Sequence, residues 1–503
     1  MAQTLVSSNL AHLIDGHAGE RIALISRGRP TTYQALRHEV DAVRGGLAAL
    51  GVGRTDRVVL LCGNGRFFVV SYLAVLGLGA TAVPLNPTSP APELQREISV
   101  VDASVVIVEP MALSAFTALD KSSIPSVKHV VITEGSALVD AVPFATLLAA
   151  EPVPVVDVDG DDLAALIFTS GTAGSPRAAM LSHANLLASL EHSLASPEAI
   201  TADDVVFGVL PLNHIFGLNV VLGLSLAAGA TLVLIQRFDP STAADTIRER
   251  SVTVLPGAPP MWVAWAHWPG LDPDTFKSVR LGLSGAAKLP EDAAQAMRDR
   301  FGVTVVEGYG LTEASPTVTT QAGIPIKAGS IGRVVGGVDV RLVDEQGDDV
   351  LDGDAGEIWV RGPNVFKGYL DDPEATARAL TADGWLRTGD IAVTDKDGYL
   401  YLVDRAKDLI IVSGFNVYPG EVEAVLAEHP GVTDVAVIGV PHPYSGEAVK
   451  AFVVARSGVH LDEEQLISYC ADNLARYKCP SKIMLVDEIP RNAGGKILRR
   501  ELR

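Results

Sequence analysis

The chain of 503 residues carries 60 acidic residues against 40 Lys and Arg residues, which gives a formal net charge of −20. A chain of this length is expected to form two or more domains. Its acidic excess excludes nucleic acid as a general partner, because that binding depends on basic side chains that neutralise phosphates.

The cysteine content and the N-terminus bear on the cellular compartment. The three cysteines, Cys62, Cys470 and Cys479, have neither the density of a disulfide framework nor the spacing of metal ligands. Residues 1–20 lack the basic and apolar regions of a signal peptide. We therefore expect a cytoplasmic protein.

Short β-branched runs alternate with segments of helical period through the first three hundred or so residues. This alternation favours βαβ units and largely parallel sheets that are buried on both faces. The strand-like runs are DRVVLLC, ATAVPL, SVVIVE, KHVVIT, AALIFT, ATLVLI, VTVLPG, SVRLGLSG and VTVVEGYG.

The stretch FTSGTAGSPRAAMLSH, residues 168–183, follows one of these runs and precedes a segment of helical period. Small residues let backbone N–H groups approach an anion closely, and hydroxyl groups add donors. The stretch does not fit the pattern of a Walker A loop. On composition alone a phosphate-binding loop and a plain surface turn are both open.

Residues 216–235 form an apolar stretch long enough to span a bilayer. An interior glycine and strand-type residues favour instead a buried helix that ends at Gly229, followed by a buried strand. We expect no integral membrane segment.

Near residue 330 the pattern changes to short strands and turns, with DEQGD and DGDAG as turn sequences. A further change near DRAKDLI precedes alternating helical and strand-like segments. We expect an N-terminal domain over residues 1–405, with a β-rich unit at about 330–405, and a C-terminal α+β domain over residues 406–503.

Nine motifs occur in the order and at the spacing of one protein family. They are TSGTAGSPR, PLNHIFG, SGAAKLP, GYGLTE, GEIWVRGP, WLRTGD, DRAKDLI, SGFNVYPGEVE and GGKILR. Over essentially its whole length the sequence resembles the adenylate-forming superfamily, which includes acyl-CoA synthetases. The resemblance implies an α/β fold, with a large domain of largely parallel βαβ sheets, a small β unit and a mobile α+β C-terminal domain.

The resemblance also implies a two-step reaction and a nucleotide site. A carboxylate is joined to the α-phosphate of ATP with release of pyrophosphate, and the acyl group is then transferred to a thiol. ATP binding is assigned by resemblance to Thr169, Ser170, Gly171, Thr172, Gly174, Arg177, Gly285, Ala286, Ala287, Glu307, Gly308, Tyr309, Gly310, Thr312, Asp390, Arg405 and Lys496.

Several of these residues have physical reasons for their roles. Tyr309 offers a ring face for adenine, Asp390 and Arg405 suit the ribose, and Glu313 is a hard-oxygen ligand for Mg²⁺. Arg177 stands where the family usually has lysine, and its planar fork can grip a phosphate bidentately. Taken singly, a Gly-Tyr-Gly sequence or a charged run is more often a turn or a solvated surface.

The catalytic, hinge and thiol-side residues are likewise implied by the resemblance. Lys496 in GGKILR would stabilise charge that develops at the reacting oxygens, Thr312 would donate to the α-phosphate, and His214 would close off the acyl-binding site. Lys407 occupies the hinge position between the two domains. The other assignments are CoA binding at Ser413, Gly414 and Phe415, and an acyl pocket at His214, Gly285, Gly308 and Gly310.

The sequence therefore predicts an acyl-CoA synthetase that uses ATP, Mg²⁺ and CoA to activate a fatty or other hydrophobic carboxylic acid. One alternative is a stand-alone adenylation enzyme that loads an aryl, dicarboxylic or fatty acid onto a carrier protein. Another is an impaired nucleotide-binding regulatory homologue, suggested by Ala173, Arg177 and Ala178. Retention of Glu313, Asp390, Arg405 and Lys496 argues against this last reading.

Overall fold

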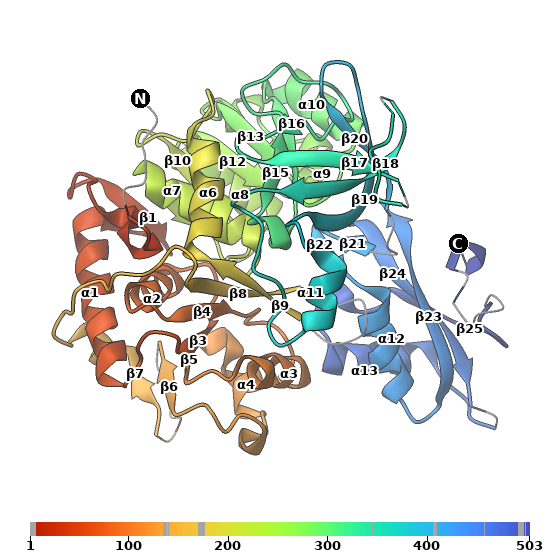
Figure 1. Ribbon diagram of the computed structural model, residues 1–503, viewed down its shortest axis with the longest axis horizontal. Coiled ribbons are helices and arrows are strands. Elements are labelled where there is room, and N and C mark those ends of the chain that lie inside the picture. Colours follow the sequence, from red (N-terminus) through yellow and green to blue (C-terminus); the bar gives the residue numbers. More distant parts are fainter. Residues whose placement is uncertain are drawn as a thin grey trace.

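The computed structural model describes residues 7–133, 138, 140–169, 177–344, 346–351, 353–405, 410–456, 458–490, 497 and 499–502, without the side chains of residues 403–405 and 500. Four sheets and their covering helices make up this part of the chain. Figure 1 shows the N-terminal part as two α/β layers, with the C-terminal part beside them.

The first sheet contains the strand-like runs nearest the N-terminus. β3–β4, β3–β5, β4–β8, β5–β6 and β6–β7 pair in parallel, whereas β9 runs antiparallel to β8. Its spatial order is β7 (Val142–Pro143), β6 (His129–Ile132), β5 (Val105–Val108), β3 (Arg57–Leu61), β4 (Thr81–Pro84), β8 (Leu163–Thr169) and β9 (Arg177–Ser182).

Both faces of this sheet are buried, as its continuous apolar runs predicted. Side chains alternate along a strand, so Val58 and Leu60 of β3 enter the large core while Val59 and Leu61 enter a second core. Helices cover the two faces of the sheet. They are α1 (Tyr33–Ala49), α2 (Arg66–Gly77), α3 (Ala91–Val101), α4 (Pro110–Thr117) and α5 (Phe144–Leu148).

The second sheet carries the strands whose ends form the site described below. Its central pairs are parallel, and β14–β15, β15–β16 and β1–β2 are antiparallel. Its order is β16 (Arg333–Val334), β15 (Thr317–Thr320), β14 (Val305–Gly310), β13 (Leu281–Ser284), β12 (Val254–Gly257), β10 (Val205–Gly208), β11 (Thr231–Leu234), β1 (Ile22–Ser26) and β2 (Arg29–Thr32). Its helices are α6 (His183–Leu194), α8 (Pro240–Glu249), α9 (Pro259–Ala266) and α10 (Glu291–Phe301).

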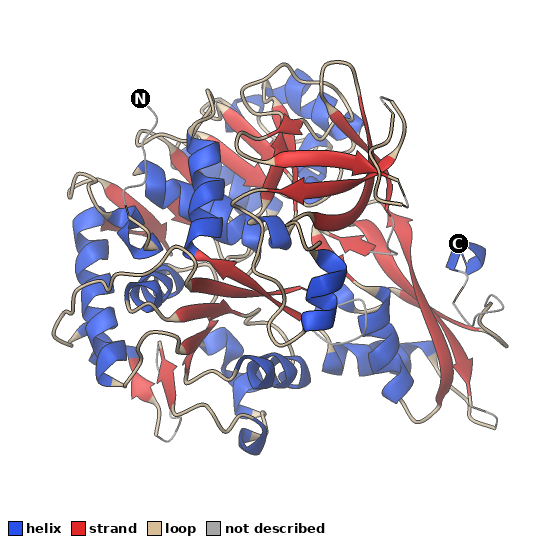
Figure 2. Ribbon diagram, viewed as in Figure 1, coloured by secondary structure: helices blue, strands red, loops and turns tan. Residues whose placement is uncertain are grey.

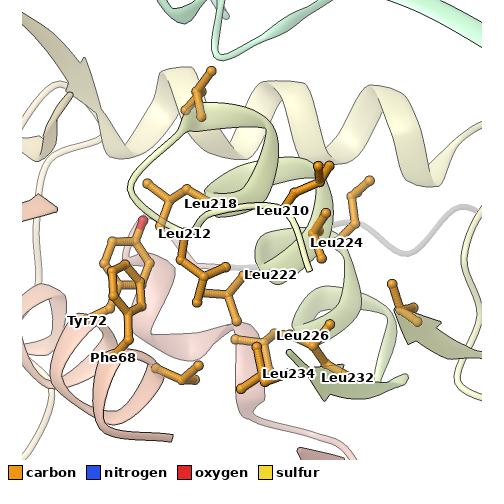
Figure 3. Close-up of a cluster of buried hydrophobic side chains, with 14 of the residues drawn as sticks. Phe68, Tyr72, Leu210, Leu212, Leu218, Leu222, Leu224, Leu226, Leu232 and Leu234 are labelled. Carbon is orange, nitrogen blue, oxygen red and sulfur yellow. The ribbon is translucent and has the colours of Figure 1, made fainter. Parts of the chain in front are cut away.

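The long apolar stretch forms a π-helix, η3 (Phe216–Gly223), which continues as α7 (Leu224–Ala228). The helix ends at Gly229, whose φ of +74° is the left-handed conformation that favours glycine, and β11 follows. Figure 3 shows Leu218, Leu222, Leu224 and Leu226 of this stretch in one buried cluster with Phe68 and Tyr72 of α2. The described part of the chain contains no helix with the length and apolar character needed to cross a bilayer.

The β-rich unit and the C-terminal part follow. The unit is an antiparallel sheet of β17 (Asp339–Val343), β18 (Gly356–Arg361), β19 (Leu386–Thr394) and β20 (Leu400–Arg405), with α11 (Pro373–Ala379) beside it. The C-terminal sheet has the order β22 (Phe415–Val417), β21 (Ile410–Val412), β24 (Gly446–Ala455) and β23 (Val432–His442), and β25 (Lys482–Leu485) pairs with β24. Helices α12 (Pro419–Glu428) and α13 (Glu463–Asn473) pack against it (Figure 2).

The predicted fold class is confirmed: largely parallel sheets, a small antiparallel unit and an α+β C-terminal part. One local prediction was wrong. The stretch at 168–183 was expected to pass from a strand through a loop to a helix, but β9 lies between that loop and α6. The loop therefore joins two antiparallel strands, with Thr169 paired to Arg177 across its base.

Candidate active site

A cavity of about 1310 Å³ lies where the second sheet, the β-rich unit and the C-terminal part meet. Ligand sites in open α/β sheets lie at the carboxyl ends of the strands, and β13 and β14 both end here. Many of the predicted site residues line it, namely Thr169, Arg177, His214, Gly285, Ala286, Ala287, Glu307, Gly308, Tyr309, Gly310, Thr312, Glu313, Asp390 and Gly414.

The glycines at the strand ends are required by close packing of the backbone. A Cβ on Gly310 would lie 2.1 Å from the Pro316 carbonyl oxygen, and one on Gly308 would lie 3.1 Å from the Thr319 carbonyl oxygen. The extended end of β14 thus fits tightly against β15, and this holds Tyr309 between the two glycines at the cavity wall. Glu307, earlier on β14, accepts a hydrogen bond from the Leu289 N–H at 3.0 Å, and burial raises the pKa of its carboxyl group.

Tyr309 and Asp390 come from different units of the fold. The Tyr309 hydroxyl donates to Oδ2 of Asp390 at 2.7 Å, and Asp390 lies on β19 opposite Arg405 of β20. The ring that the resemblance assigns to adenine and the carboxylate that it assigns to the ribose are therefore adjacent. The structure describes Arg405 only by its backbone, at the end of β20.

Arg177 is held by two neighbours that the sequence did not indicate. Its Nε donates to Oδ2 of Asp372 at 2.9 Å, and its guanidinium lies 5.8 Å from the centre of the Tyr369 ring. Hydrogen bonds from the Ala375 N–H and from Arg177 lower the pKa of Asp372. Backbone pairing of residues 367–370 with β9 creates this arrangement. No local pattern in FKGYLDDPE predicts a contact with a residue 195 positions earlier.

The Tyr369 hydroxyl donates to Oε1 of Glu313 at 2.6 Å. Burial and the adjacent Glu313 carboxylate raise the pKa of Tyr369, so the phenol stays a donor. Glu313 itself is 8% exposed and lines the cavity. Within the described ranges no group of three or more His, Cys, Asp or Glu side chains could hold a metal ion. A single carboxylate fits Mg²⁺ when phosphates and water supply the other ligands.

His214 lies at the junction with the C-terminal part. Its Nδ1 accepts the Phe216 N–H at 3.2 Å, and burial lowers its pKa to about 4, so the ring is neutral at pH 7. Because Nδ1 is an acceptor, the ring proton is on Nε2. The Phe415 ring lies edge-on to the His214 ring, with 6.1 Å between the ring centres, and stacks on the Tyr477 ring, with 4.4 Å between the ring centres.

Gly414 brings the C-terminal part directly onto the cavity. It has a φ of +87°, and a Cβ there would lie 3.3 Å from that of Ala258 and 3.6 Å from that of Ala286. Ala286 also has a positive φ of +68°, which is rare for a residue with a Cβ. Ser413 lies with Gly414 in the turn between β21 and β22, and Phe415 is the first residue of β22.

Some predicted site residues lie outside the described residues. These are Ser170, Gly171, Thr172, Gly174, Lys407 and Lys496, and their assigned roles stay predictions. The residues that sequence reasoning missed are Tyr369 and Asp372, together with Asn416 and Tyr418, which line the cavity from the C-terminal part.

Part of the cavity lining is apolar. This part includes Ile200, Val220, Leu224, Leu281, Leu283 and Val335. His192 and Ser284 also line the cavity, but Nδ1 of His192 and Oγ of Ser284 are themselves buried, and neither has a hydrogen-bond partner among the described residues. An unsatisfied buried polar atom is costly unless a ligand or water pairs with it.

Comparison with known proteins identifies the family. The AMP-binding enzyme family matches residues 12–370, and the AMP-binding enzyme C-terminal domain matches residues 421–496. The 4-coumarate–CoA ligase 3 of Oryza sativa subsp. japonica is 35% identical, over 98% of this chain and 88% of that protein. A long-chain-fatty-acid–CoA ligase of Bacillus subtilis is 34% identical, over 96% of this chain and 91% of that protein.

Among solved structures, the amide bond synthetase McbA from Marinactinospora thermotolerans superposes with a TM-score of 0.88. It is 30% identical, and the match covers 98% of this chain and 99% of that one. McbA thus shares the architecture over nearly the whole chain, while the activities named for these relatives differ in the acid and in the acceptor.

Proposed function

The chain belongs to the AMP-binding enzymes of the adenylate-forming superfamily and is an AMP-forming acid–thiol ligase, and from this premise we propose that it converts a hydrophobic carboxylic acid to its CoA thioester. ATP and CoA are the co-substrates, and Mg²⁺ accompanies the nucleotide. The acid first becomes an acyl adenylate with release of pyrophosphate, and the CoA thiol then displaces AMP.

The observation that carries this proposal is the make-up of one cavity. Nucleotide-side groups, apolar side chains and residues of the C-terminal part all line it. A reaction that joins a nucleotide, an apolar acid and a third reactant needs these three zones in contact. Proximity of this kind supplies much of the rate acceleration in two-substrate reactions.

Adenylation brings two anions together, so positive charge and oriented donors should dominate its catalysis. We assign phosphate binding to the loop at 169–177, with Arg177 as its cation, and the charge of the reacting oxygens to Lys496. Glu313 would hold Mg²⁺, whose chemistry is to neutralise phosphate charge. Neutral His214 offers an Nε2–H donor at the acid side of the site.

The proposed acyl substrate follows from the apolar part of the cavity lining. Leu224, Leu281, Leu283 and Val335 suit an aliphatic or aromatic body.

A panel of acids with ATP, Mg²⁺ and CoA tests the proposal. Aliphatic, aryl and hydroxyaryl acids should release AMP and form the CoA thioester in equal amounts, with small hydrophilic acids inactive. AMP release that requires a phosphopantetheinylated carrier protein in place of CoA would replace the proposal with the carrier-loading alternative.

A second candidate acceptor is an amine, favoured by the structural similarity to the amide bond synthetase. The same panel should be run with a primary amine in place of CoA. A faster yield of amide than of thioester at matched acceptor concentrations would favour amide synthesis.

A further inference from the structure

The N-terminal and C-terminal parts also meet at a second place, away from the cavity. Helix α3 of the first sheet lies beside α13 and the short helix η6 (Arg476–Lys478), as Figure 1 shows for α3 and α13. Arg96 of α3 donates to the Asn473 carbonyl oxygen at 3.0 Å across this junction. The junction is thus a specific contact between two parts of the chain 377 residues apart.

A buried ion pair closes the junction. The Lys478 ammonium pairs with Oε1 of Glu93 on α3 and, at 2.7 Å, with Oε1 of Glu421 on α12. The second oxygen of Glu93 accepts the Ala475 N–H at 2.6 Å. The side chains of Lys478, Glu93 and Glu421 are 6%, 3% and 4% exposed. Both carboxylate oxygens of Glu93 therefore bind groups of the C-terminal part.

The same domain arrangement places the C-terminal part at the cavity. Tyr477 stacks on Phe415, which meets His214, and Lys478 is the next residue after Tyr477. The Glu93–Lys478 contact is therefore separated from the Phe415–His214 contact by a single stacked ring. Tyr477 thus connects the junction to the Phe415–His214 contact.

We propose that Glu93 and Lys478 are positioning residues that dock the C-terminal part for the thioester-forming step. The inference rests on the proposed function, in which one site carries out two successive reactions. Lys478 already has Glu421 as a partner within the C-terminal part, so separation of the domains leaves the ammonium paired. Docking adds Glu93 and the Ala475 hydrogen bond, and these two contacts are specific to this arrangement.

The carboxylates at the junction also link docking to protons. Glu97 of α3 faces Glu93 and Arg96 of its own helix, Glu421 of α12, and Tyr477 and Lys478 of η6. One oxygen of Glu97 and one of Glu421 are buried without a hydrogen-bond partner among the described residues. Burial, reinforced by the charges of Glu93 and Glu421, raises the pKa of Glu97 from 4.5 to about 8.

The raised pKa of Glu97 determines whether docking becomes stronger or weaker as the pH rises. When the junction opens, Glu97 regains solvent and its ordinary pKa, so docking takes up a proton. Docking is strongest below pH 4.5 and weakens as the pH rises from 4.5 through about 8.

Glu93→Ala tests the docking role because it leaves the Lys478–Glu421 pair in place. ATP–pyrophosphate exchange measures adenylation, and supplied acyl adenylate with CoA measures the thioester step. The variant should keep adenylation and lose roughly tenfold or more in the thioester step, the scale of a charge-assisted hydrogen bond. Hydrogen exchange at the Ala475 amide should accelerate, since that N–H loses its acceptor.

Glu109→Ala is the matched control. Glu109 is 2% exposed and pairs with Arg27 inside the N-terminal part, so its loss lowers stability without touching the junction. It should leave the ratio of the two half-reactions unchanged. Equal losses in both half-reactions for Glu93→Ala, or an unchanged thioester step, would overturn the docking role.

Glu97→Gln tests the proton linkage through the pH dependence of the two half-reactions. A merely structural role of Glu97 would not change that pH dependence. The thioester-to-adenylation ratio of the native protein should fall between pH 6 and pH 8, and this variant should flatten the fall. An identical pH profile in both proteins would overturn the proton linkage. Failure of the proposed function is distinct from either result, because the native protein would then form no thioester with any acid.

Discussion

At the scale of single residues, the polar groups of the cavity are already bonded to one another. Arg177 bonds Asp372, Tyr369 bonds Glu313, and Tyr309 bonds Asp390. Such pairs fix side-chain positions before a ligand arrives, which lowers the entropic cost of binding. The departure of Arg177 from the lysine usual in the family is explained by this setting, since a guanidinium has an Nε–H that bonds Asp372 and lysine has no such group.

Arg177→Lys should raise the KM for ATP by roughly tenfold with a smaller change in kcat. Lysine lacks the Nε bond to Asp372 and the planar contact with Tyr369, and the two cations are not interchangeable at such sites. Steady-state kinetics with varied ATP measures this. An unchanged KM would mean that charge alone matters at this position.

Gly310→Ala should abolish adenylation. Its Cβ would lie 2.1 Å from the Pro316 carbonyl oxygen, so the end of β14 must move and carry Tyr309 with it. Pyrophosphate exchange measures the loss. Gly302→Ala is the control for adding a methyl group at a glycine in the same region, because its Cβ would meet nothing within 4 Å; its φ of +68° predicts a modest stability loss with exchange retained.

At the scale of elements, the two ends of the strands in the second sheet have different roles. The carboxyl ends form the candidate site, and the amino ends stabilise the sheet. The carboxyl ends of β13 and β14 line the cavity. At the opposite ends, Asp204 precedes β10, Thr253 precedes β12 and Arg280 precedes β13. Asp204 accepts from Thr253 Oγ1 at 2.7 Å and from Arg280 Nη2 at 2.6 Å, and thereby clamps these strands together.

Asp204→Asn should lower the free energy of unfolding by about 1–3 kcal/mol at pH 7, because its amide cannot satisfy all the donors now aimed at the carboxylate. Burial opposes the charge of Asp204, but hydrogen bonds from Arg280, Thr201 and Thr253 outweigh it and lower the pKa from 3.8 to about 2.

A lowered pKa stabilises the fold above pH 3.8, and this stabilisation is lost as the pH falls toward 2. The stability difference between the native protein and Asp204→Asn should therefore shrink over that range. Urea unfolding at several pH values measures it. A difference that stays constant down to pH 2 would contradict the clamp.

At the scale of the whole molecule, the two half-reactions place different demands on one cavity. The arrangement described here sets Gly414, Asn416 and Tyr418 at the cavity wall. Ile497, next to Lys496, packs against the C-terminal sheet with Ile438 and Phe452. The resemblance implies that the C-terminal part changes its orientation between the two steps, with Lys496 as the predicted cation of adenylation and Lys407 as the predicted hinge.

Lys496→Ala should reduce adenylation by roughly 10²-fold or more, the scale for removal of one preorganised charge stabiliser. Thioester formation from supplied acyl adenylate should survive. The two half-reactions are assayed separately, and Lys482→Ala, on an exposed position of β25, serves as the control. Equal loss of both steps in Lys496→Ala would remove the assignment.

Much of the architecture and of the cavity lining could be predicted from the sequence. Continuous apolar runs require sheets buried on both faces, and a glycine such as Gly229 must end a helix because it alone adopts φ of +74° without strain. The order of nine motifs indicated the family, and many of the residues in them line one cavity. These features depend on local pattern and spacing, which the sequence carries.

Only the tertiary structure decided which polar and charged residues that are far apart in the sequence pair with one another. Tyr369 and Asp372 reach Arg177 through backbone pairing of residues 367–370 with β9, and β9 itself was missed beside the motif loop. Glu93 and Lys478 lie 385 residues apart and meet in a buried pair. Such contacts leave no local pattern, because each charged residue taken alone is indistinguishable from a solvated one until the fold removes the water around it.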